Sequence, residues 1–198
     1  SDNVYVTGTT QSTDLPLMNP ISSSLSGTAD AFVVKFNPDL STLLFASYLG
    51  GDLSDSGNSI QLSSSGDIFV GGGTQELTFL SSYTSLHQNT PQGAREGYVV
   101  KINGSTFQLE SVRFISSNSY DQVYFVQLDN DDDVYVYGQT QGDLTTFGCS
   151  YGFDDRSQSI MKFNTGKLYG KYAHPLGVIY NQKNLNIRKN TLKKLPFF

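Results

Sequence analysis

The sequence has one cysteine, two histidines and no tryptophan, and these counts exclude several kinds of site. Cys149 has no partner in the chain, so no intrachain disulfide can form. His87 and His174 lie far apart and fit no zinc-ligand spacing, and neither sits in a recognisable triad pattern. Phosphate-binding loops, dinucleotide-binding glycine motifs and nucleophile elbows are also missing. We therefore expect no catalytic residues.

Long apolar stretches and an even spread of charge are missing too. No run of about 18 apolar residues occurs, so we expect no membrane-spanning helix. The chain opens at Ser1 without a basic and then apolar leader, as a mature or excised fragment would. All 18 acidic residues lie in residues 1–155, whereas residues 156–198 carry only basic charges. Because residues 1–155 are strongly acidic, they would repel the phosphates of a nucleic acid. We therefore expect no nucleic-acid partner.

The sequence does contain a repeat. A strand-like segment ending in Gly and followed by Thr-Gln occurs at residues 4–8, 68–72 and 134–138. A second segment, apolar around a lysine and ending in Asn, occurs at residues 32–37, 98–103 and 160–164. Both segments keep a spacing of about 65 residues, so the chain is a series of similar units.

Each unit is predicted to hold four short strands. Its apolar segments are rich in β-branched and aromatic residues and are separated by Gly, Asn, Asp and Ser, the pattern of antiparallel hairpins. Repeated four-stranded sheets indicate a β-propeller, with a solenoid as the alternative. We expect an all-β fold of four-stranded antiparallel blades. The chain length gives about three blades, fewer than the roughly 4–8 of closed rings, so the propeller would be incomplete or open.

The predicted organisation is a propeller region over residues 1–179 and a basic tail over residues 180–198. Within the first region we place a partial blade at residues 1–29, blades at 30–96 and 97–158, and a second partial blade at 159–179. The long loops that follow the fourth strands should emerge on one face. The tail is predicted to be either a docking element for an acidic or anionic surface or a frayed terminus.

Four stretches of the sequence resemble one known family. They are VYVTGTTQSTDLP at residues 4–16, DAFVVKFNP at residues 30–38, SYLGG at residues 47–51 and SSGDIFVGG at residues 64–72. Together they resemble the bacterial seven-bladed β-propeller repeat (SBBP) family, strongly over residues 1–75 and more weakly over residues 97–141. The resemblance implies a large secreted or cell-surface bacterial protein, often from species with type IX secretion, and it carries no fixed catalytic residues.

The expected function is a non-catalytic binding or scaffold module that recognises a protein or a glycan through blade loops. One alternative is a fragment of a glycan-processing propeller enzyme, which would need two carboxylates about 5–10 Å apart. Another is a component associated with an outer-membrane secretion or motility apparatus. Open blade edges also predict self-association or strand addition by a partner.

The acidic corner at residues 129–133 is the candidate metal site. Asp129, Asp131 and Asp133 have the spacing with which a calcium-binding loop begins. The closing glutamate is absent, since Thr140 stands in its place, and the central Gly is missing too. The corner therefore fits either a calcium site or a solvated hairpin turn, and no other cofactor is expected.

Aromatic residues in the long loops are candidate binding residues, because exposed rings form platforms for sugars and proteins. They are Phe79, Tyr83, Phe147, Tyr151 and Phe153. The same rings would serve as a minor core if they folded over the sheet edges.

Recurring charged residues have structural interpretations. Asp55 and Asp121 occupy equivalent places in two units and are predicted to cap turns, with a ring of acids around a channel as the alternative. Lys35, Lys101 and Lys162 recur within apolar strands, so their stems are predicted to pack while the ammonium reaches solvent or a carboxylate.

Overall fold

The computed structural model describes residues 2–75, 79–86, 95–117, 119–141, 157–164, 167–173 and 179–180, with side chains for residues 2–75, 79–83, 95–117 and 119–141. In these ranges the chain is all-β apart from one 3-10 helix, η1 (Ser81–Leu86). The predicted all-β, antiparallel character is confirmed. No helix in the described ranges is long and apolar enough to cross a membrane.

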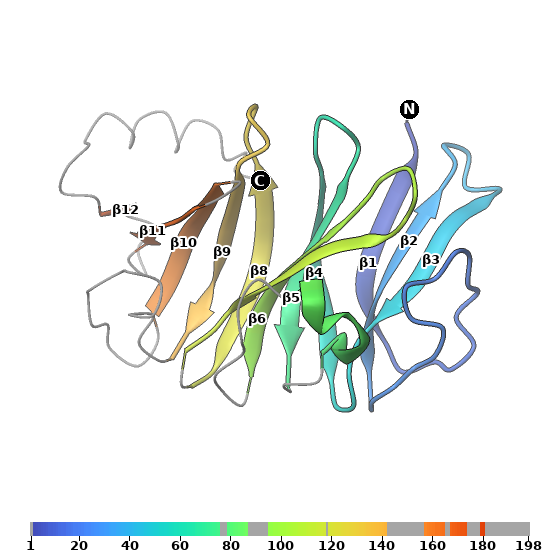
Figure 1. Cartoon of the computed structure of the whole chain (residues 1–198), viewed down its shortest axis with the longest axis horizontal. Coiled ribbons are helices and arrows are strands. Elements are labelled where there is room, and N and C mark those ends of the chain that lie inside the picture. The colour runs from blue at the N-terminus through green and yellow to red at the C-terminus, as the bar shows by residue number, and fades with distance from the viewer. Residues whose placement is uncertain are drawn as a thin grey trace.

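The strands form three antiparallel sheets that follow one another along the chain (Figure 1). The first sheet contains β1 (Val4–Thr10), β2 (Asp30–Phe36) and β3 (Leu43–Leu49). The second contains β4 (Asp55–Leu62), β5 (Ile68–Thr74), β6 (Glu96–Ile102) and β7 (Leu109–Ile115). The third contains β8 (Asp121–Leu128), β9 (Val134–Thr140), β10 (Ser157–Asn164), β11 (Lys167–Ala173) and β12 (Ile179–Tyr180).

The recurring sequence segments occupy equivalent strands. The segment that ends in Gly forms β1, β5 and β9, and the segment around the lysine forms β2, β6 and β10. These two kinds of strand pair with each other in every sheet. The sheets therefore cross the unit limits expected at residues 96–97, because β5 pairs with β6 across the long loop between them. The second sheet begins at β4 and the third at β8, and among the described residues the first sheet has no equivalent of these two strands.

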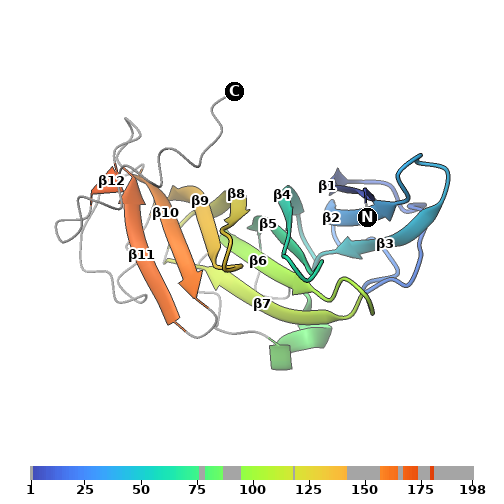
Figure 2. The ribbon, with the colours of Figure 1, turned by 90° about the horizontal axis from the view of Figure 1, so that it is seen from above.

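Neighbouring sheets pack face to face. Strands β1 and β2 lie against β4, while β5 and β6 lie against β8. Seen from above, β1, β4 and β8 lie along one side of the molecule and β7 lies toward the other (Figure 2). The second sheet is consequently covered on both faces, which explains why every residue of β5 is buried.

Two apolar clusters fill the spaces between the sheets. The larger one joins residues of the first and second sheets, among them Val33, Phe45, Val70 and Phe114. The smaller one joins the second and third sheets through Phe69, Val99, Val123, Val126 and others. Alternation along β5 sends Val70 to one cluster and Phe69 to the other, as a strand with two buried faces requires.

Small residues set the distance between the sheets. A Cβ added at Gly57 of β4 would lie 2.3 Å from Thr7 Oγ1 of β1. A Cβ added at Gly71 of β5 would lie 2.3 Å from Val126 Cγ2 of β8. Each junction thus places a glycine on one sheet against a side chain of the other, and this fit fixes how closely the sheets approach.

Candidate functional site

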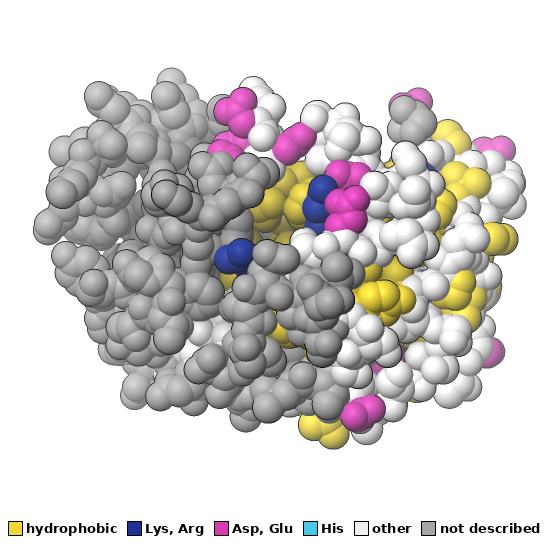
Figure 3. Space-filling view, viewed as in Figure 1, with side chains coloured by type: hydrophobic (Ala, Val, Ile, Leu, Met, Phe, Trp, Pro, Cys, Tyr) yellow, Lys and Arg dark blue, Asp and Glu magenta, His cyan; other side chains and the backbone are white. Residues whose placement is uncertain are grey.

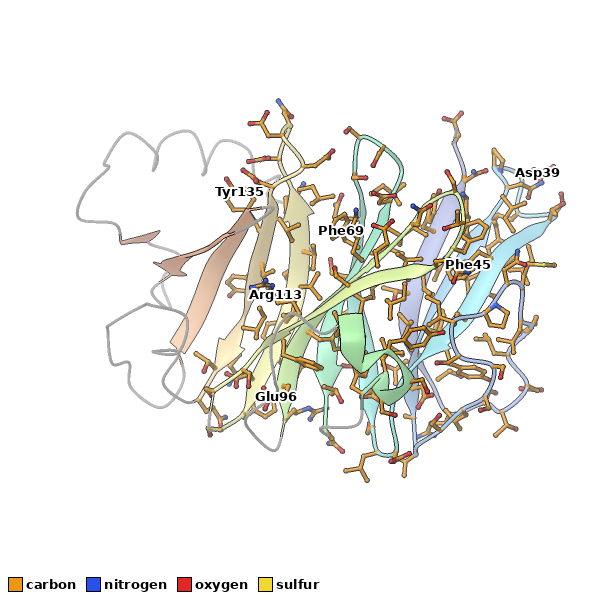
Figure 4. The ribbon with its side chains drawn as sticks, in the orientation of Figure 1. Asp39, Phe45, Phe69, Glu96, Arg113 and Tyr135 are labelled. Carbon is orange, nitrogen blue, oxygen red and sulfur yellow. The ribbon has the colours of Figure 1, made fainter. Side chains whose placement is uncertain are left out.

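Buried carboxylates mark the two junctions between sheets. Asp30 and Asp55 stand at the starts of β2 and β4, and Glu96 and Asp121 stand at the starts of β6 and β8. All four are fully buried. Figure 4 shows Glu96 at the lower end of the sheets, opposite the end that carries Tyr135.

Their hydrogen bonds repeat from one junction to the next. The Asp55 backbone N–H donates to Ala29 O at 2.7 Å, and the Asp121 N–H donates to Arg95 O at 2.9 Å. The Asp55 carboxylate accepts from Gly51 N–H at 2.8 Å, and the Asp121 carboxylate accepts from both the N–H and the hydroxyl of Ser117. The predicted turn-capping role of this repeated acid is confirmed.

The recurring Thr-Gln pair lies at the same two sheet junctions as the capping aspartates. Thr74 pairs with Asp55, and Thr140 pairs with Asp121, in the strand registers. The N–H of the following glutamine closes the loop, because Gln75 donates to Ser54 O and Gln141 donates to Tyr120 O. The sequence showed the Thr-Gln repeat but no role for it. In the structure its threonine lies opposite the capping aspartate on the neighbouring strand.

Burial raises the pKa values of two ionisable groups at the junctions, Asp121 and Tyr98. Desolvation raises the pKa of Asp121 to about 6, opposed by hydrogen bonds from Thr140 and Ser117 and reinforced by the charge of Glu96. Burial, with Asp55 and Asp30 nearby, also raises the pKa of Tyr98, whose hydroxyl donates to Ser56 O at 2.9 Å. The two junctions therefore hold their carboxyl groups away from solvent.

The recurring lysines occupy different environments. Lys101 forms ion pairs with Glu110 at 2.6 Å and with Asp67 at 3.0 Å, as predicted for a packed stem with an ammonium that reaches carboxylates. Lys35 instead lies over the rings of Tyr5 and Phe107, at 5.2 and 5.0 Å from their centroids. Lys162 lies in β10, outside the residues whose side chains are described.

At the acidic corner the side chains bond to their own loop. Asp129 Oδ1 accepts from the N–H groups of Asp131 and Asp133 at 3.1 and 3.0 Å, and its Oδ2 accepts from Tyr135. In the preceding sheet, Ser63 Oγ accepts from Asp67 N–H in the same way. Asp129 thus replaces a serine as turn cap. Within the described ranges, no three His, Cys, Asp or Glu side chains are grouped as metal ligands.

The corner also contacts the second sheet. Asp132, which has a left-handed backbone with φ of 59°, accepts hydrogen bonds from Ser64 N–H and Ser64 Oγ in the preceding equivalent turn. Several Asp and Glu side chains lie along this upper edge of the described surface (Figure 3). The hydrogen bonds of Asp129 are those of a hairpin turn, and those of Asp132 join this turn to the equivalent turn of the second sheet.

Two of the five candidate loop aromatics lie in the described residues. Phe79 is fully buried and packs at 4.3 Å on Tyr98 and at 6.3 Å on Phe114, measured between ring centroids. Tyr83 packs against the same cluster and donates its hydroxyl to Ile21 O. These two rings form core rather than an exposed platform. Phe147, Tyr151 and Phe153 lie outside the described residues.

An aromatic surface that the sequence analysis did not single out lies on the third sheet. Phe125 of β8 is 58% exposed, and its ring centroid is 6.1 Å from that of Tyr137 on β9. Tyr124 lies 6.4 Å from the same Tyr137 ring and donates to Gln139 Oε1 at 2.6 Å. We call Tyr124, Phe125, Tyr137 and Gln139 the β8–β9 surface.

Comparison with known proteins adds no family. No protein-family model matches the chain, and no curated protein matches it either.

Proposed function

We propose that the chain is a series of β-propeller blades and serves as a non-catalytic binding module of a secreted or cell-surface bacterial protein. The observation that carries the proposal is the junction built on Asp55 and repeated at Asp121, with the same cap and the same backbone bonds. Residues that recur once per unit hold sheets together, so the variable positions remain for recognition. The resemblance to the SBBP family supports the cellular location.

The partner is a protein or a glycan. Large side chains at the surface of a sheet are a common basis for such recognition, and the β8–β9 surface offers the exposed Phe125 beside the half-buried Tyr124 and Tyr137. Self-association through the open edge of β1, or membership of an envelope complex, would use another part of the same scaffold.

A glycan-processing enzyme has less support. Such an enzyme needs two carboxylates that both reach the substrate. Asp55 and Asp121 are fully buried and bind backbone N–H groups instead. A catalytic pair at the junctions would require the sheets to separate.

The test is a paired assay on the purified full chain. Binding to a glycan array and to bacterial envelope extract is measured alongside release of reducing sugar from the same glycans. We expect retention of a glycan or a protein without release of sugar. Turnover, or retention of neither class of partner, would overturn the proposal.

A further inference from the structure

The outer face of the β8–β9 pair differs from that of the equivalent β4–β5 pair at several positions where the second sheet contacts the third. In the second sheet, Asn58 Nδ2 donates to Val123 O at 2.7 Å and Ser59 Oγ accepts from Val126 N–H at 3.0 Å. Gly71 lies against Val123 and Val126. All of these contacts come from short side chains or from glycine.

The equivalent residues of the third sheet are large. The 66-residue shift that aligns Asp55 with Asp121 also aligns Asn58 with Tyr124 and Ser59 with Phe125. The same shift aligns Gly71 with Tyr137 and Gly73 with Gln139. A further sheet therefore cannot pack on this face as the third packs on the second, because the Tyr137 ring occupies the space that Gly71 leaves open.

The four replacement residues form one surface with a defined geometry. Tyr137 stands between Phe125 and Tyr124, with interplanar angles of 35° and 44° to their rings. The hydrogen bond from Tyr124 to Gln139 fixes the outer ring before any ligand arrives. Burial raises the pKa values of Tyr124 and Tyr137 above the usual value, so none of the four side chains is charged at neutral pH.

We propose that the β8–β9 surface binds a neutral polysaccharide. The apolar C–H face of a pyranose ring packs on aromatic rings, and its hydroxyl groups bond to amide and phenol groups at the margin. Three neighbouring rings with no charge among them suit a neutral sugar chain better than a charged ligand, whose charge they would leave unpaired. This inference rests on the proposed binding function and names its partner.

The experiment is affinity electrophoresis of the full chain in gels that contain hydroxyethyl cellulose, xylan, laminarin or dextran. We expect at least one polysaccharide to retard the protein. Phe125→Ala and Tyr137→Ala should each weaken the retardation about tenfold or more, as removal of a central aromatic contact does. Phe125→Trp should keep it, because a larger ring preserves the stacking surface.

A matched control is Leu40→Ala, since Leu40 is also 58% exposed but lies in the first sheet's turn. It should not change the retardation, and thermal unfolding of each variant checks that Tyr137→Ala still folds. Unchanged retardation in both aromatic-to-alanine variants would move the site elsewhere and overturn the inference. Retardation by none of the polysaccharides, with a protein retained from envelope extract, would overturn it while leaving the proposed binding function standing.

Discussion

Asp121 lies fully buried between the second and third sheets, and its carboxylate accepts two hydrogen bonds from Ser117. Its burial outweighs these bonds, so its pKa lies at about 6, above the usual value for an aspartate. The folded protein therefore holds a proton on this residue at mildly acidic pH, when the unfolded chain has already released it. The residue links the stability of the junction to pH.

We expect the free energy of unfolding to fall as the pH rises from about 4 to about 6 and then to level off. The sign follows because the folded state binds more protons than the unfolded state in this window, and a shift of about two pKa units corresponds to about 3 kcal/mol at most. Asp121→Asn should remove this slope, since the amide does not titrate and still accepts from Ser117. Urea unfolding at pH 4, 5, 6 and 7 measures how the free energy of unfolding depends on pH in both proteins.

The control for that measurement is Asp131→Asn, because Asp131 is exposed in the turn at residues 129–133. It should keep the wild-type slope. A slope of the opposite sign in the wild type, or an equal slope in the Asp121 variant, would show that another group governs the pH dependence.

Two glycines of strand β5, Gly71 and Gly73, face the third sheet. Different side chains of that sheet lie opposite each of them. A Cβ at Gly71 would lie 2.3 Å from Val126 Cγ2 and 2.8 Å from Val123 Cγ1, both in the branched side chains of a packed cluster. A Cβ at Gly73 would lie 3.2 Å from Gln122 Cγ, part of a long side chain that can shift. The same substitution at the two sites should therefore have unequal effects.

Gly71→Ala is expected to lower the free energy of unfolding by about 1–3 kcal/mol, the usual cost of overfilling a core. Gly73→Ala should change it by no more than about 0.5 kcal/mol. Adding Val126→Ala to Gly71→Ala should return part of the loss, because it removes the methyl group that the new Cβ meets. Urea unfolding of the four proteins is the measurement, and equal losses at both glycines would refute the spacing argument.

Strands and their repeats could be predicted from the sequence because alternation and turn residues act locally. The grouping into sheets could not, since β5 pairs with β6 across a long loop while unit limits were placed at that loop. The sequence left Phe79 open between a binding platform and a minor core, because a polar loop does not show which side its ring faces. In the structure the ring packs on Tyr98, which removes its apolar surface from water. The β8–β9 surface was missed although the repeat alignment shows Tyr137 in place of Gly71.

On the scale of the whole molecule, the first sheet differs from the other two at the edge formed by β1. Strand β5 pairs with β4, and β9 pairs with β8, but β1 pairs only with β2 among the described residues. An edge of this kind accepts an additional strand through backbone hydrogen bonds. The equivalent pairs put Asp55 opposite Thr74 and Asp121 opposite Thr140, so an added strand should put its acid opposite Thr10.

The second sheet limits which strand fits at that edge. An added strand would face β4 as β4 faces β8, and β4 makes that contact through the short side chains of Asn58 and Ser59. A labelled peptide with the β4 sequence (residues 54–62) should therefore bind the full chain, as measured by fluorescence anisotropy. The β8 peptide (residues 120–128) should bind more weakly, because Tyr124 and Phe125 stand at the two contact positions.

The salt dependence of binding distinguishes strand addition at the edge of β1 from attraction between charged side chains. Backbone pairing along an edge is little affected by ionic strength, whereas contacts between exposed charges weaken when the Debye length falls to about 3 Å at 1 M salt. Binding of the β4 peptide should therefore persist at 1 M sodium chloride. Equal affinity for both peptides, or loss of binding in salt, would show that charge or nonspecific contact, rather than the open edge of β1, holds the peptide.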